Sequence, residues 1–529
     1  MFCRLHLPAV MAAALAIAIP HGSFAFELAI DAKAPPSQAA AVPAPPAQID
    51  AAVAKLDELA AEIMRKSGIP GMSVAVVRDG KTVYAKGFGV RKAGESATVD
   101  ADTVFQLASL SKPVGASVVA AQVGKGVVQW DTPIVKALPW FALSDKAVTR
   151  MVTIGDLYAH RSGLPDHGGD ALEYLGYARN DILKQLRYLP LAPFRASYAY
   201  TNFGLTAAAE AVAVASGLDW ATLSDRALYL PLGMNRTSSR FEDFAHRDNH
   251  AVNHAMVDGK YQPRYQREPD EQSPAGGVSS SANDMAKWMA MMLAGGMHDG
   301  KTIVVKDALL PALRPQAVSS PPADVSERTG FYGYGMNVGV APSGRVTLSH
   351  SGAFLLGAAT SLTLIPSLNV GIVVLSNAAP TGAVETLCAE FADLVQFGTV
   401  TRDWYTAYAG LFANMEKPFG AMAGKTPPAK PKPFAAPELY KGTYANKYFG
   451  KAVIVHKAGA FTLTLGNKGQ KSFPLRHWDG DTFVFDLDGE DAAPGSVSTL
   501  VFDRKRGKAK SLQIEYFGED LAKGVFRRE

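Results

Sequence analysis

The sequence predicts an α/β sandwich followed by a small all-β, barrel-like domain. Strand-like runs occur at both ends of the region from about residue 50 to residue 395, with a mostly helical block between them. The first hairpin and the last strands of this region are therefore expected to share one sheet. A proline- and lysine-rich linker at 417–437 separates the domain predicted at 48–416 from regularly spaced short β runs at 438–529.

The first 25 residues have the pattern of a secretory signal peptide. Arg4 supplies a positive charge, an apolar stretch follows at 8–19, and a small-x-small cleavage site ends at Ala25. We expect cleavage after Ala25 and a periplasmic or secreted protein without a membrane span, because no later run reaches about 20 apolar residues. Residues 26–47 are rich in alanine and proline and are predicted to form a tether.

The first ordered element is expected near Asp50, which can cap a helix that ends at Gly68. The apolar positions of this helix recur at helical spacing, at Val53, Leu56, Leu59 and Ile63. Two strands are then predicted, at 72–77 and 82–88, joined by an Asp-Gly hairpin turn.

Later elements complete the first domain. Ser281 begins a capping-box pattern for a helix with an apolar stripe of Met285, Trp288, Met289, Met292 and Leu293. We interpret this methionine-rich stripe as core rather than as a binding groove. Strands are predicted at 345–350, 358–365 and 370–377, followed by a helix that holds Cys388 in the core.

The last predicted domain has short β runs at 453–455, 461–465, 483–485, 499–502 and 512–516. Regular spacing of such runs is typical of a barrel or sandwich. The sequence leaves three roles open for this domain: it can cap a cleft, form an oligomer contact, or only stabilise the chain.

Ser109 and Lys112 form the one S-x-x-K of the chain. On a helix, positions three apart share a face, so the Lys112 amine would lie beside the Ser109 hydroxyl. A serine hydroxyl is a poor nucleophile at neutral pH, and an amine that desolvation keeps partly neutral can take its proton. Pro113 fits the first turn of a helix that starts near Leu110.

Acyl transfer also needs an acid for the leaving group and donors for the oxyanion. Tyr200-x-Asn202, in a turn-like stretch, and His350-x-Gly352, at the end of a predicted strand, supply candidates. Similar patterns begin at Tyr444, His167 and His298. They are set aside, because the first lies in the C-terminal domain and the two histidines lie among loop residues rather than on a strand that could border a cleft.

In this order and spacing, the Ser109, Tyr200 and His350 patterns resemble the three motifs of the serine β-lactamase and penicillin-binding-protein superfamily. Flanking segments resemble its class C β-lactamase-like branch, which includes D-aminopeptidases, D-Ala-D-Ala carboxypeptidases and esterases. Those segments lie at 102–105, 160–164, 231–234 and 276–280. The resemblance covers roughly residues 50–395 and implies that family's sandwich of a sheet and a helical block. The C-terminal part resembles the lipocalin-like β domain of some peptidases in this branch.

The resemblance implies that Ser109 attacks a carbonyl carbon and forms an acyl-enzyme that water then hydrolyses. It also implies that Lys112 and Tyr200 share the proton transfers. Tyr200 can act as a base only if a cation such as Lys112 lowers its ordinary pKa of about 10.

The remaining implied residues bind substrate or complete the catalytic set. The N–H groups of Ser109 and Ala353 would form the oxyanion hole, and Asn202 would hold the substrate amide and the lysine. Gly352 would belong to the strand that lines the cleft, and His350 would complete the catalytic set.

One departure from the family pattern bears on the substrate. Class C β-lactamases carry Lys-Thr-Gly where this chain has His350-Ser351-Gly352. A charged lysine attracts the carboxylate of a β-lactam, whereas a histidine is mostly neutral at pH 7. We therefore expect a peptidase or amidase acting on peptides that contain D-residues, with linearised microcystin-type peptides as a specific candidate. The alternatives are a carboxylesterase, a β-lactamase and a non-catalytic penicillin-binding or assembly protein.

Other function classes find little support. The net charge of +4 is too small to indicate nucleic-acid binding, and no basic stripe with interleaved aromatics is present. His246, His250 and His254 recur every four residues without a metalloprotease motif, so we interpret them as solvent-exposed. No metal or cofactor is expected. The expected partners are a small peptide or ester substrate and a second copy of the chain, bound through the C-terminal domain.

Overall fold

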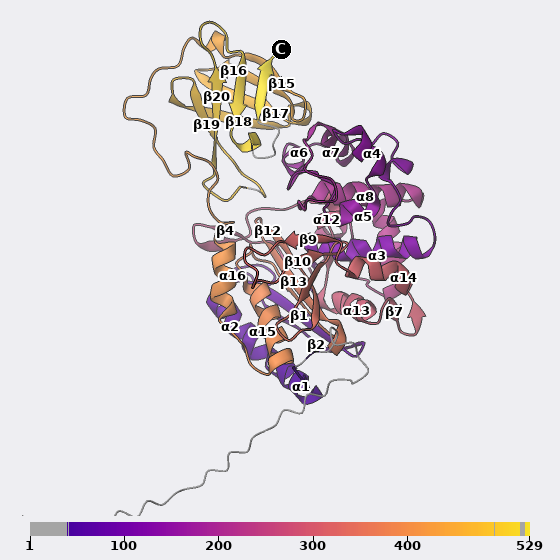
Figure 1. The fold of residues 1–529 in the computed structure, drawn as a ribbon. Coiled ribbons are helices and arrows are strands. Elements are labelled where there is room, and N and C mark those ends of the chain that lie inside the picture. Colours follow the sequence, from indigo (N-terminus) through magenta and orange to yellow (C-terminus); the bar gives the residue numbers. More distant parts are fainter. Residues whose placement is uncertain (1–39, 41, 491, 519–523) are drawn as a thin grey trace, which may run out of the picture.

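The computed structural model describes residues 40, 42–490, 492–518 and 524–529. The predicted signal peptide and the predicted tether up to residue 39 lie outside these ranges. The chain folds into a sheet flanked by helices on both faces, followed by a barrel that packs beside the helical block (Figure 1). Within the described ranges, no helix is both long and apolar enough to cross a membrane.

The central sheet has eight antiparallel strands in the order β2-β1-β14-β13-β12-β11-β10-β9. Their bounds are β1 Gly71–Arg78, β2 Lys81–Gly89, β9 Ala317–Ser320, β10 Gly330–Tyr332, β11 Asn337–Val340, β12 Val346–Phe354, β13 Ala358–Ile365 and β14 Val370–Ser376. Met72 of β1 pairs with Ser376 of β14, so the first hairpin and the returning strands share one sheet, as predicted. The strand predicted at 345–350 continues to Phe354, which places Gly352 and Ala353 inside a strand.

One face of the sheet is covered by α1 Pro46–Ala54, α2 Leu56–Ser67, α15 Ala383–Phe397 and α16 Trp404–Phe412 (Figure 1). The single helix predicted from Asp50 is therefore two helices, and the first begins four residues earlier, at Pro46. Proline suits this position because the first helical residues have no intrahelical acceptor for an N–H. Cys388 is a free, buried core residue of α15, as predicted.

The opposite face carries the helical block. Its longer helices are α3 Ser111–Gly124, α8 Asn202–Ala215 and α13 Ala282–Leu293. Shorter helices are α4 Lys146–Met151, α5 Ile154–Tyr158, α6 Asp170–Tyr174, α7 Arg179–Gln185, α9 Trp220–Ser224, α10 Leu230–Leu232, α11 Phe241–Ala245, α12 Ser273–Gly276 and α14 Lys306–Leu309. Three two-stranded ribbons accompany them: β3 Phe105–Gln106 with β6 Ser279–Ser280, β4 Ala255–Val257 with β5 Lys260–Gln262, and β7 Met297–His298 with β8 Lys301–Thr302.

The methionine-rich stripe of α13 belongs to the core, as predicted. The Ser281 side chain caps the helix by accepting a hydrogen bond from the Asp284 N–H at 3.3 Å. The Asp284 carboxylate does not close the predicted box but accepts from the Arg236 N–H at 2.7 Å. Met285 and Met289 are fully buried between this helix and the sheet.

The C-terminal domain is a closed eight-stranded barrel. Its strands are β15 Gly442–Asn446, β16 Gly450–Lys457, β17 Ala460–Leu465, β18 Lys471–Asp479, β19 Thr482–Asp486, β20 Val497–Asp503, β21 Ser511–Ile514 and β22 Val525–Arg528. Four of the five predicted runs lie within strands, and the fifth, 512–516, extends two residues past the end of β21 at Ile514, into a turn that includes Tyr516. Strands β15, β18 and β22 were not predicted. Polar residues interrupt each of these three strands, and β18 also contains a proline, so none has a continuous apolar run.

The barrel docks on α6 of the helical block (Figure 1). The Tyr174 ring packs edge-on against Tyr516 at 5.6 Å between centroids and lies under the Lys471 amine at 4.5 Å. The Tyr177 hydroxyl donates to the Phe449 carbonyl at 3.0 Å. These contacts fix one rim of the barrel over the region where the predicted catalytic residues lie.

We predict that Met289→Ala lowers the free energy of unfolding of the first domain by about 2–5 kcal/mol, because it leaves a cavity between α13 and the sheet. Urea titration followed by tryptophan fluorescence measures this change. The matched control is Met297→Ala, whose side chain is 38% exposed and should change stability by less than about 0.5 kcal/mol. Equal effects for both variants would contradict the core assignment.

Candidate active site

Ser109 lies on a sharp turn at the start of α3. Ala108, the residue before it, has a φ of 47°, a left-handed conformation that a residue with a side chain adopts rarely. The 3₁₀ turn Ala108–Leu110 then leads directly into α3, which contains Lys112 and Pro113 in its first turn. The turn presents the Ser109 hydroxyl at the helix start, beside the lysine three residues on.

The Lys112 amine is fully buried and held by three acceptors. Its Nζ donates to Ser109 Oγ at 3.0 Å, Asn202 Oδ1 at 2.7 Å and the Ala275 carbonyl at 3.0 Å. Burial lowers the pKa of Lys112 to about 7, and the Asp170 carboxylate opposes this shift. At neutral pH the amine is therefore divided between its neutral and charged forms, and the neutral form can take a proton from Ser109.

Tyr200 lies on the other side of this pair. Its ring centroid is 4.5 Å from Lys112 Nζ, and its hydroxyl hydrogen-bonds with Ser109. A phenolate base would require Lys112 to lower the tyrosine pKa, but burial raises that pKa well above its ordinary value and the Ser109 hydrogen bond offsets only part of this rise. The hydroxyl stays protonated, so Tyr200 can carry a proton but does not provide a phenolate base.

His350 lies behind Tyr200 and does not line the cavity at Ser109. Its Nε2 accepts from the Tyr332 hydroxyl at 2.9 Å, and its Nδ1 donates to the Ser351 carbonyl at 2.7 Å. Burial, with a contribution from Lys112, lowers the pKa of His350 to about 3. The ring is neutral and 5% exposed, and its centroid lies 6.4 Å from that of the Tyr200 ring.

Strand β12 brings Gly352 and Ala353 against the serine turn. A Cβ added to Gly352 would lie 2.3 Å from the Leu107 carbonyl oxygen and 2.8 Å from the Ser109 nitrogen. This close backbone approach requires glycine. Ala353, the next residue, lines the same cavity as Ser109, which is the arrangement an oxyanion hole made by their two N–H groups requires.

The cavity that contains Ser109 has a volume of about 600 Å³. Tyr200, Asn202 and Ala353 line it from the first domain. Its opposite wall comes from the end of the first domain, the linker and the barrel, through Met415, Lys417, Phe419, Glu490, Ala493 and Tyr516. Of the three roles left open for the C-terminal domain, the structure therefore shows that it contributes a wall of this cavity.

Acidic side chains outnumber basic ones in this cavity. The carboxylates belong to Asp166, Asp170, Glu173 and Glu490, and the cations belong to Arg267 and Lys417. Glu173 and Arg267 form an ion pair at 2.6 Å. A site of this composition offers little attraction to a substrate carboxylate.

The sequence did not single out several residues that the structure brings to this site. Asp170 and Glu490 were not considered, and His167 was set aside as a loop residue, yet all three line the cavity. His167 lies three residues after the recognised flanking segment 160–164, which is the signal that could have found it.

The three histidines at four-residue spacing form no metal site. His254 was expected to be exposed but is fully buried. Its Nε2 accepts from the Ala93 N–H at 2.9 Å and its Nδ1 donates to the Asn377 carbonyl at 3.0 Å, so both ring nitrogens have a partner in the interior. Among the residues that the structure describes, no group of three histidine, cysteine or acidic side chains could hold a metal ion.

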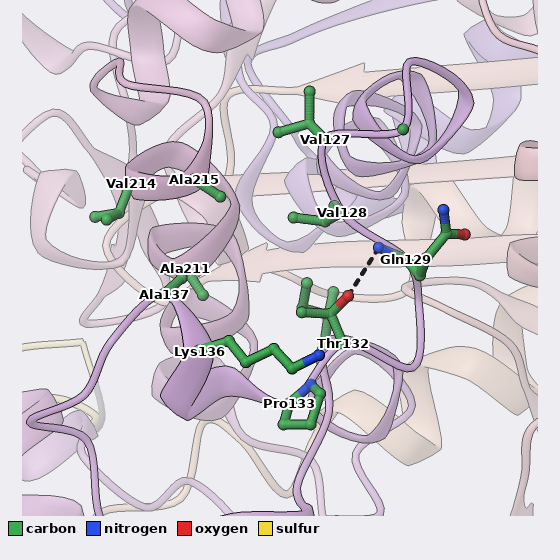
Figure 2. A pocket seen from close by; sticks show the side chains of 12 residues that line it. Val127, Val128, Gln129, Thr132, Pro133, Lys136, Ala137, Ala211, Val214 and Ala215 are labelled. Atoms are coloured by element: carbon green, nitrogen blue, oxygen red, sulfur yellow. Dashed lines mark hydrogen bonds between the residues drawn. The ribbon is translucent and has the colours of Figure 1, made fainter.

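A second cavity of about 470 Å³ lies in the helical block, away from Ser109. Figure 2 shows Val127, Val128, Ala211 and Val214 in its lining. Lys136 is the one charged residue that lines it, and the Gln129 N–H is already bonded to the Thr132 hydroxyl at 2.9 Å. Its lining contains no serine, cysteine or histidine.

Comparison with known proteins bears on both domains. The family described as Beta-lactamase matches residues 56–397, and a domain of unknown function (DUF3471) matches residues 426–525. The second match adds no activity to the barrel.

The chain is 29% identical over 422 residues to unguisins hydrolase ungD' of Aspergillus campestris, which covers 75% of this chain and 76% of that protein. It is 24% identical over 352 residues to the D-alanyl-D-alanine-carboxypeptidase/endopeptidase AmpH of Escherichia coli K12. This match covers 64% of this chain and 88% of AmpH. An octameric penicillin-binding protein homologue from Pyrococcus abyssi has the same fold, with a TM-score of 0.57 and 19% sequence identity. The superposition covers 88% of this chain and 98% of that chain. Since the family match spans more than half of the chain, this protein belongs to the β-lactamase family of serine hydrolases.

Proposed function

We propose that this protein is an exported serine peptidase or amidase that forms an acyl-enzyme on Ser109 and acts on peptides containing D-residues. The observation that carries the proposal is the fully buried Lys112 amine, 3.0 Å from Ser109 Oγ, with a pKa of about 7. A non-catalytic binding protein would have no use for a desolvated amine aimed at a serine hydroxyl, since burying it costs free energy.

The reaction follows from the groups present. Neutral Lys112 takes the Ser109 proton as Oγ attacks the carbonyl carbon, and the oxyanion is stabilised by the N–H groups of Ser109 and Ala353. The proton then passes from Lys112, through the neutral Tyr200 hydroxyl, to the leaving amine as the C–N bond breaks. A water molecule then attacks the acyl carbon and gives a proton to Tyr200 and Lys112. The bond between the acyl carbon and Ser109 Oγ breaks, and that proton returns to Oγ, which regenerates Ser109.

The substrate class rests on charge and on the relatives. A neutral His350 stands where a charged lysine would attract a carboxylate, and carboxylates outnumber cations in the cavity. Both features disfavour penicillins and favour neutral or cationic peptides. AmpH is named for a D-alanyl-D-alanine substrate, which supports a preference for D-residues here. Linearised microcystin-type peptides are a specific candidate, and an esterase using the same acyl-enzyme is the alternative.

Two further parts of the proposal concern the whole chain. Export to the periplasm or the medium rests on residues 1–25, which lie outside the described ranges. A homo-oligomer formed through residues 438–529 stays a prediction from the sequence. The division into a domain at 48–416, a linker at 417–437 and a barrel domain at 438–529 is retained as the working arrangement.

We predict that a serine-directed fluorophosphonate transfers its phosphonyl group to Ser109 with loss of fluoride, so that the mature chain gains the reagent mass less HF. Ser109→Ala should abolish the adduct and lower hydrolysis by roughly four orders of magnitude. Intact-protein mass spectrometry measures the labelling. Incubation with a penicillin in parallel should give no stable adduct. An unlabelled native chain would exclude an activated Ser109.

We predict that kcat/KM for a D-amino-acid amide rises with pH through about 7 and falls tenfold for each unit below it, because Lys112 must be neutral to accept the serine proton. Glu385, buried in α15 beneath the sheet, also has its pKa raised by burial to about 7. The control Glu385→Gln should leave the acid limb in place. A flat profile between pH 5 and 8 would argue against Lys112 as the base.

We predict that Glu490→Ala lowers kcat/KM for peptides by about tenfold, because a hydrogen bond to a charged group contributes about 1.5–3 kcal/mol. Glu490 of the barrel accepts from the Leu355 N–H at 2.6 Å, two residues after Ala353. Steady-state kinetics measures the change. Glu438→Ala, which removes an exposed barrel carboxylate paired with Lys441, is the control and should have no effect. Unchanged kinetics in both variants would mean that the barrel wall does not shape the site.

A further inference from the structure

A chain of hydrogen bonds leads from Lys112 away from Ser109 to a carboxylate. Lys112 Nζ donates to Asn202 Oδ1 at 2.7 Å. Asn202 Nδ2 in turn donates to Asp170 Oδ2 at 2.9 Å. The His167 Nδ1 lies 2.8 Å from the same Asp170 oxygen. Asp170 therefore contacts the lysine only through the amide of Asn202.

The carboxylate decides which way the Asn202 amide points. An ionised Asp170 only accepts hydrogen bonds, whereas the asparagine amide has a donor end and an acceptor end. The NH₂ group must face Asp170, so the oxygen must face Lys112. Without the carboxylate, the amide could turn and present its NH₂ group to the Lys112 amine, which would place two donors against each other.

The surroundings of Asp170 hold it in place. Its side chain is 10% exposed. The loop before it is anchored where the His167 N–H donates to the Tyr200 carbonyl at 2.8 Å. Gly169 has a φ of 110°, and a Cβ there would lie 2.7 Å from the Phe203 ring. Asp170 Oδ1 is buried and makes no hydrogen bond within the described part of the chain. Such an unpaired oxygen costs stability, so the residue needs a reason beyond folding.

We propose that Asp170 is a positioning residue of this site, which fixes the Asn202 amide so that its oxygen holds the Lys112 amine on Ser109. The inference rests on the function proposed above for Ser109 and Lys112. Asp170 touches neither the nucleophile nor the lysine, so it acts through Asn202.

The charge of Asp170 has a second consequence for Lys112. The other titratable groups that face the lysine are His160, His350 and Tyr200, and burial favours the neutral form of each. The Asp170 carboxylate raises the pKa of Lys112 against the larger effect of burial. Removing this charge while keeping the hydrogen bonds should therefore lower the pKa of Lys112.

The experiment measures the second-order rate of fluorophosphonate labelling against pH for the full mature chain and three variants. Asp170→Asn keeps an oxygen that can accept from Asn202 but loses the charge. Asp170→Ala loses both. Asp181→Asn is the matched control, because Asp181 lies on α7 outside the cavity lining, has a side chain that is 51% exposed, and pairs with Lys184 at 3.8 Å. Thermal unfolding of each variant reports whether it is folded.

We expect Asp170→Asn to keep a rate within about tenfold of the native chain at high pH and to move the acid limb about half a unit or more to lower pH. Folded Asp170→Ala should label about a hundredfold more slowly throughout, because a small displacement of a catalytic group has an effect of this size. Asp181→Asn should follow the native profile. A residue needed only for folding would change the unfolding temperature without moving the acid limb.

The inference is overturned if the Asp170→Asn profile superimposes on the native one or moves to higher pH, or if folded Asp170→Ala labels at the native rate. The Asp170→Asn result decides the question even if Asp170→Ala does not fold. Failure of the native chain to label at all would instead overturn the proposed function. The two failures are thus separate.

Discussion

Desolvation of one amine governs the chemistry of this protein. The ammonium form of lysine is strongly hydrated, and complete burial of Lys112 removes that hydration and brings its pKa to about 7. Three acceptors are then needed to hold the amine, and one of them is the Ser109 hydroxyl. The surrounding fold supplies a dry position and these acceptors.

Each element around the lysine contributes to that position. The turn at Ala108 aims the serine, α8 presents Asn202 at its first residue, and α12 supplies the Ala275 carbonyl. Strand β12 approaches so closely that position 352 must be glycine. Because these elements lie far apart in sequence, the site exists only when the sheet and the helical block are packed together.

Electrostatics around the lysine is dominated by burial rather than by pairs of charges. Burial lowers the pKa of His350 to about 3 and raises that of Tyr200, so both rings are neutral beside an amine that titrates near pH 7. Asp170, behind Asn202, is the carboxylate that acts on Lys112. A phenolate at Tyr200 does not form, because burial raises the tyrosine pKa and outweighs the hydrogen bond from Ser109 that lowers it.

Local sequence determined much of this protein: the hairpin, the three returning strands, the buried stripe of α13, and the pairing of Ser109 with Lys112, whose spacing of three residues is fixed by helix geometry. The family resemblance located Tyr200, Asn202 and Ala353. Only the tertiary structure decided the protonation of the site and the barrel wall with Glu490, because desolvation depends on how many distant segments exclude water from a side chain. The contact of Asp170 with Asn202 likewise joins separate elements and leaves no periodic signal in the sequence.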